Sequence, residues 1–137
     1  MAMKDLYPGI DRRRFQRVNV KFIASYKVED PLEARALTLN REIPSIAMDL
    51  SEEGIALSTE YKIPTAAILM ISFPLFSTGT MNADDARFIQ IRGEVRYRVL
   101  VEETNDYRLG IQFKYVSNED KDAIVRFINE RKIASYI

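Results

Sequence analysis

Alternation of apolar and polar residues is the feature that most restricts the fold of this chain. The longest alternating segment covers residues 88–101, and a second covers residues 18–27. The apolar set of the first segment is Ile89, Ile91, Gly93, Val95 and Tyr97. Successive side chains of a strand point to opposite faces, so both segments predict strands with one buried face. In the second segment, only Ile23 breaks the pattern.

Four shorter apolar segments, separated by turn-forming residues, predict four more strands. They cover Ile43–Leu50, Ile55–Thr59, Ile68–Phe73 and Tyr107–Tyr115. Residues 51–54 between the first two have the composition of a tight turn. As a turn alone, it would use Asp49 to cap its own backbone and Gly54 in a left-handed conformation. The connection at 29–42 is expected to carry short irregular structure, and 77–85 is expected to be a loop.

Only the C-terminal segment changes to a helical period. Ser117 precedes an acidic residue three positions later, which is typical of a helix N-cap. The apolar residues that follow lie on one stripe, at Ala123, Ile124, Phe127 and Ile128. These patterns predict a mainly β protein: a six-stranded antiparallel β-barrel with a C-terminal α-helix at about 118–132. We expect one domain at 12–133, a flexible arm at 1–11 and a tail at 134–137.

The composition excludes most catalytic sites. The chain has no Cys and no His, so disulfides, thiolate nucleophiles, Ser/His dyads and most zinc sites are excluded. We therefore expect no enzyme, no metal and no cofactor. The N-terminal residues lack the apolar core of a signal peptide, and the longest apolar run, residues 66–76, is too short to span a membrane. A cytoplasmic protein without membrane insertion is expected.

Basic residues are concentrated near the N-terminus. Residues 12–21 hold five of the 20 basic residues and none of the 20 acidic ones, so the rest of the chain carries a net charge of −5. A local positive excess in a neutral protein predicts a compact site for a small anion, rather than a broad nucleic-acid face.

Two short motifs lie on either side of the first long alternating segment. Residues 13–17 read Arg-Arg-Phe-Gln-Arg, which is an RxxxR motif, and residues 49–54 read Asp-Leu-Ser-Glu-Glu-Gly, which is a DxSxxG motif. In this order they resemble the PilZ domain, a bacterial receptor for the second messenger cyclic di-GMP. The resemblance extends to residues 93–95 and 107–113, and covers the chain from about Asp11 to Ile133.

The resemblance implies a non-enzymatic sensor that binds cyclic di-GMP. It gives Arg13 and Arg17 the clamp on guanine and phosphate, which suits the planar fork of a guanidinium. It gives Asp49 the guanine N1 and N2 donors, since a carboxylate accepts from both. Ser51 and the backbone near Gly54 would complete the floor of the pocket.

Arg12, directly before the RxxxR motif, implies two ligand molecules per site. It can stack on a guanine of the second molecule and offset the additional phosphates. The arm that carries these arginines is expected to close over the ligand, and an unidentified effector protein would recognise the changed surface.

Two other functions remain open from the sequence. The first is a constitutive protein-interaction module that does not bind nucleotide. The second is a small nucleic-acid-binding barrel that uses the basic residues of one hairpin, Arg87, Arg92, Arg96 and Arg98. The zero net charge and the lack of an aromatic series argue against the nucleic-acid barrel.

Overall fold

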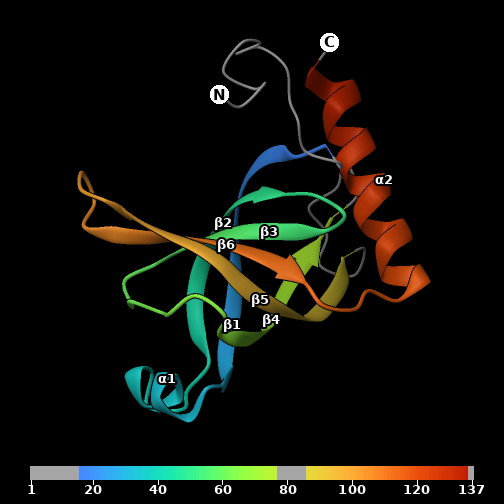
Figure 1. Ribbon diagram of the computed structural model, residues 1–137. Helices are drawn as coiled ribbons and strands as arrows, with labels where there is room; N and C mark the ends of the chain where they lie inside the picture. Colours follow the sequence, from blue (N-terminus) through green and yellow to red (C-terminus); the bar gives the residue numbers. More distant parts are fainter. Residues whose placement is uncertain (1–15, 77–85, 136–137) are drawn as a thin grey trace, which may run out of the picture.

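Six strands form a closed antiparallel barrel in the part of the chain that the computed structural model describes, residues 16–76 and 86–135 (Figure 1). The strands are β1 (Val18–Asp30), β2 (Ile43–Leu50), β3 (Gly54–Thr59), β4 (Ile68–Leu75), β5 (Arg87–Val101) and β6 (Asp106–Phe113). Their order around the barrel is β1-β2-β3-β6-β5-β4. The predicted barrel is thus confirmed, and β1 runs three residues beyond its alternating segment.

The inside of the barrel is filled by the apolar faces of all six strands. Tyr26, Leu57, Ile71 and Leu109 are among the side chains that are fully buried. Phe73 stacks between Phe22 and Phe113, with ring centroids 5.9 and 6.4 Å away. The period-two patterns were the signal for this core, because each buried face must be covered by the opposite wall of the barrel.

Helix α2 (Asn118–Ser135) covers the barrel beside β1 and β4, as Figure 1 shows at the right. The backbone N–H of Asp120 donates to Ser117 Oγ at 3.1 Å, so the predicted N-cap is present. Ile124 and Ile128 are buried, and Phe127 meets the Phe22 ring edge-on at 6.2 Å. The apolar stripe therefore closes the core, as the sequence predicts.

A short helix, α1 (Leu32–Leu37), occupies the connection between β1 and β2. We expected irregular structure there, but most of these residues are good helix formers and Pro31 begins the turn. The helix ends where Leu39 and Asn40 adopt positive φ angles. Figure 1 shows α1 at the end of the barrel away from α2.

Strand register determines which residues share the outer face of the barrel. On β6, Leu109, Ile111 and Phe113 point inward, so Arg108 and Gly110 face outward. We expected Tyr97 on the inner face with Val95. The register shifts between these two residues, and the ring of Tyr97 lies outside, 41% exposed. A β-bulge of this kind reverses the side on which the following residue points.

Candidate functional site

The pairing of β1 with β2 brings the two sequence motifs together. Arg17 lies directly before β1, and Asp49 is paired with Asn19 near the end of β2. Arg17 Nη1 donates to Asp49 Oδ1 at 2.9 Å. Arg12 and Arg13 lie outside the described residues. The last arginine of RxxxR and the first residue of DxSxxG are thus one ion pair.

A second guanidinium, that of Arg108, completes this cluster. Arg108 Nη2 donates to Asp49 Oδ2 at 2.6 Å, so each carboxylate oxygen accepts from a different arginine. The Asp49 side chain is only 8% exposed, whereas those of Arg17 and Arg108 are 19% and 34% exposed. Two positive charges on one buried negative charge leave a net charge of +1. We refer to Arg17, Asp49 and Arg108 as the arginine cluster.

Arg108 was not predicted as a site residue. It lies 59 residues after Asp49 and comes close only because β3 pairs with both β2 and β6. Asp49 pairs with Ala56, which in turn pairs with Gly110, two residues beyond Arg108. The sequence pattern shows that a basic residue lies on the outer face of β6, but it does not show that this residue is close to Asp49.

Ser51 and Gly54 build the turn that carries Asp49. The buried Ser51 Oγ accepts from the N–H groups of Glu53 and Gly54, both at 3.2 Å. This hydroxyl is therefore committed to the turn, which is a local side-chain-to-backbone arrangement typical of serine. Asp49 is not only a turn residue, because its two oxygens accept from two arginines outside the turn.

Gly54 has a different role from the left-handed turn residue that we considered. Its φ lies outside the left-handed region, and it begins β3. A Cβ added there would lie 2.3 Å from the backbone oxygen of Ile111. The glycine is required because β3 and β6 approach closely at this point. The DxSxxG motif therefore fixes the strands beneath the arginine cluster.

A small pocket of about 220 Å³ opens beside the arginine cluster. Its lining comprises Arg17, Glu53, Arg96, Tyr97, Gly110, Ile111 and Gln112. The Tyr97 ring lies on Gly110, since a Cβ at Gly110 would fall 1.8 Å from the Cε2 atom of the ring. An aromatic face next to a guanidinium is suited to a flat, electron-rich heterocycle.

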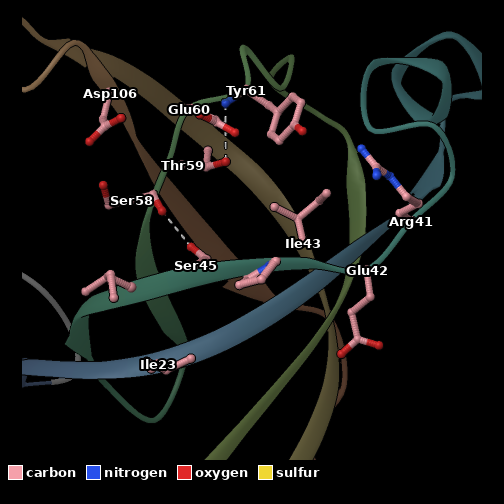
Figure 2. Close-up of a pocket in the computed structure, with 12 residues that line it drawn as sticks. Ile23, Arg41, Glu42, Ile43, Ser45, Ser58, Thr59, Glu60, Tyr61 and Asp106 are labelled. Atoms are coloured by element: carbon pink, nitrogen blue, oxygen red, sulfur yellow. Dashed lines mark hydrogen bonds between the residues drawn. The ribbon is translucent and has the colours of Figure 1, made fainter.

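A larger pocket of about 560 Å³ lies farther along the outer face (Figure 2). Its charged side chains are Arg41, Glu42, Glu60 and Asp106. Three carboxylates beside one guanidinium disfavour an anion, by simple Coulomb repulsion. The candidate site for an anionic ligand is therefore the arginine cluster with the smaller pocket.

Outside the candidate site, the described residues include a buried polar pair, which stabilises the barrel. Burial raises the pKa of Tyr26 to about 12, and its hydroxyl is 2.7 Å from Thr59 Oγ1 inside the barrel. Among residues 16–76 and 86–135, no group of three or more acidic side chains is placed to hold a metal ion. No helix in this part of the chain is long and apolar enough to cross a membrane.

The arginines of β5 do not form a free basic surface. Arg87 and Arg92 form ion pairs with Asp120 and Glu29 at 2.9 and 2.6 Å. Arg96 forms an ion pair with Glu94 at 3.7 Å and also donates to the Gln112 side chain, whereas Arg98 donates to the backbone oxygen of Ile63. Because three of these four charges are compensated by carboxylates, the structure does not favour the nucleic-acid-binding barrel.

Comparison with known proteins gives one family and several similar folds. The sequence profile of the PilZ domain matches residues 11–130. A search of curated proteins finds no match.

Similar solved structures include three bacterial proteins. The inhibitor of motility MotI/DgrA of Bacillus subtilis has a TM-score of 0.70 and 16% identity, over 91% of this chain and 53% of that chain. The K. pneumonia MrkH–c-di-GMP complex has a TM-score of 0.63 and 15% identity, over 93% and 54%. The PilZ domain of YcgR from Escherichia coli with c-di-GMP has a TM-score of 0.59 and 15% identity, over 92% and 96%. The chain thus spans about half the length of MotI and MrkH, and the likeness concerns the fold.

Proposed function

The chain belongs to the PilZ domain family, and we propose that it is a non-enzymatic receptor for cyclic di-GMP. The observation that carries this proposal is the ion pair of Arg17 with Asp49, which joins the two motifs in one partly buried cluster of net positive charge. Two proteins of the same fold, YcgR and MrkH, are described as complexes with c-di-GMP.

Asp49 can hold the arginines and a guanine together. A carboxylate has about four acceptor positions, and the two arginines use one on each oxygen. The remaining positions can accept the N1 and N2 hydrogens of guanine. Arg13 and Arg17 would donate to the phosphate and to the O6 and N7 atoms of guanine. Ser51 and Gly54 would act by fixing the floor of the site.

Arg108 and Tyr97 extend the proposed site beyond the two motifs. Arg108 adds a donor on the far side of Asp49. The exposed ring of Tyr97, in the pocket that Arg17 also lines, would stack on one base. Stacking of a base on an aromatic side chain contributes about 1–3 kcal/mol.

Arg12 would permit a second ligand molecule, and closure of the arginine-bearing arm would change the surface that an effector protein recognises. Isothermal titration with cyclic di-GMP should give two ligands per chain, and one for Arg12→Ala. One ligand per chain for both proteins would contradict the role of Arg12. Amide hydrogen exchange at residues 8–20 should slow when ligand is added, and no change there would argue against this closure.

The decisive experiment is a calorimetric titration of Arg13→Ala and Arg13→Lys beside the unaltered protein. We expect the affinity to fall at least about tenfold in both, because an ammonium lacks the planar fork. Arg126→Ala is the matched control, since it removes one exposed positive charge from α2. No heat from the unaltered protein at high micromolar ligand would overturn the proposal and favour a constitutive interaction module.

A further inference from the structure

The larger pocket lies where two neighbouring strands separate. β2 pairs with β1 from Ile43 onward, but its pairing with β3 begins only at Ile46, opposite Ser58. Residues 43–45 and 59–61 therefore diverge and bound an opening of about 560 Å³ on the outer face. Figure 2 shows side chains from both strands around this opening. We refer to it as the acidic groove.

The charges of the acidic groove are not compensated. Within the described part of the chain, Glu60 and Asp106 form no ion pair, and Glu42 accepts only from Ser25 Oγ. Arg41 uses its Nε to donate to a backbone oxygen at 3.4 Å. Three carboxylates against one guanidinium leave a net charge of −2, on a surface where a basic group can approach without displacing an existing ion pair.

Apolar side chains accompany these carboxylates. Ile23 is 68% exposed and is paired with Ile46 on the neighbouring strand. Pro44 is also exposed and lines the same groove. The exposed Ile23 beside the half-buried Ile46 is apolar area that a partner can cover. Acidic groups beside this isoleucine pair match a ligand that is both basic and apolar.

We propose that the acidic groove docks a segment of a partner protein in which Lys or Arg residues alternate with aliphatic residues. The basic groups would meet Glu60 and Asp106, and the aliphatic groups would cover Ile23 and Ile46. Pro44 removes a backbone donor from β2, so recognition depends on side chains more than on strand addition. This site uses no residue of the arginine cluster and does not depend on nucleotide binding.

Titration of the isotope-labelled protein with short peptides, followed by amide chemical shifts, tests the proposal. The probe is acetyl-Val-Arg-Ile-Lys-Val-amide. Three comparison ligands are a peptide with Glu at both basic positions, a peptide with Ser at the aliphatic positions, and spermidine. We expect saturable shifts at residues 23, 45, 46, 58–60 and 106 with the probe alone. No shifts, shifts elsewhere, or equal shifts with spermidine or the acidic peptide would overturn it.

Variants of the groove must weaken the same peptide. Glu60→Gln with Asp106→Asn should reduce the affinity about fivefold, and Ile23→Ser should also reduce it. Ile23 and Glu60 are exposed and Asp106 is half-buried without an ion-pair partner among the described residues, so these variants should fold. Glu119→Gln with Asp122→Asn on α2 is the charge-matched control and should bind normally. Arg17→Ala should also bind normally, which separates this proposal from the nucleotide site. Unchanged affinity in the groove variants would refute docking here.

Discussion

The arginine cluster and the acidic groove occupy the same outer face of the barrel but have opposite charge. Arg108 and Asp106 are two residues apart on β6, so the sign changes within about 7 Å. In the arginine cluster, one carboxylate is buried between two arginines. In the groove, the carboxylates of Glu60 and Asp106 have no ion-pair partner among the described residues. Buried, compensated charges are positioned by the fold, whereas exposed, uncompensated charges are available to a partner.

The two regions should differ most in the free energy of unfolding that is lost when one carboxylate is removed from each. Asp49→Ala leaves Arg17 and Arg108 facing each other, and we expect a loss of about 2 kcal/mol in the free energy of unfolding. Cyclic di-GMP affinity should fall about a hundredfold, because a guanine acceptor and the orientation of Arg17 are lost together. Urea unfolding and calorimetry measure the two effects.

Asp106→Ala is the matched control for that substitution. Because Asp106 is in no ion pair with the described residues, its removal should change stability by less than about 0.5 kcal/mol. If both variants were equally stable, the contrast between a structural and an available carboxylate would be wrong.

Alkaline pH should act on the floor of the acidic groove. Thr59 lines the groove and bonds to the buried Tyr26 hydroxyl, whose pKa is raised to about 12. Below about pH 10 both states keep the proton, so this stabilisation is complete. Between about pH 10 and 12 only the unfolded state ionises, and the free energy of unfolding falls by up to about 3 kcal/mol.

Tyr26→Phe isolates this contribution. Urea midpoints at pH 9 and at pH 11.5 should fall less for the variant than for the unaltered protein. In Tyr26→Phe, Thr59 Oγ1 still accepts from the Tyr61 N–H, so no buried oxygen is left without a partner. An identical decrease in both proteins would show that other groups account for the alkaline loss.

Gly110 tests the pocket beside the arginine cluster, with a smaller expected effect. In Gly110→Ala the new Cβ must displace the Tyr97 ring, which is a side chain at the surface and can move. We expect a stability loss of about 1 kcal/mol and a loss of about three- to tenfold in cyclic di-GMP affinity. Tyr97→Ala should give the same loss of affinity. Normal binding by Tyr97→Ala would remove the ring from the site.

The sequence predicts the strands well and the site only in part. Regular alternation, as in residues 88–95, reports burial directly, because one face of each strand must enter the barrel. Arg17 and Asp49 are found by motif, and the structure brings them into contact. Tyr97 was placed on the wrong face because a single bulge in β5 leaves no mark on the apolar pattern.

Arg108 and Gly54 depend on contacts between strands that are distant in sequence. Arg108 reaches Asp49 through closure of β3 onto β6, and Gly54 is small because Ile111 passes close to it. Neither requirement is local, so neither the spacing of residues nor turn propensity reports it. Arg108 was not predicted as a site residue, and Gly54 was predicted for a different structural reason, because the closure of the barrel rather than a single strand determines both roles.

The smallest effect on ligand affinity should come from reversing one charge of the acidic groove next to the arginine cluster. Asp106→Lys places a positive charge two residues from Arg108, which should raise cyclic di-GMP affinity about twofold at low salt. At about 1 M salt the screening length is about 3 Å, so the gain should vanish, whereas at about 0.01 M it is about 30 Å. Asp106→Asn should give about half of the change in binding free energy. If Asp106→Lys and the unaltered protein had equal affinities at low and at high salt, the two regions would not influence each other electrostatically. A partner in the groove could then alter nucleotide binding only through backbone movement along β6.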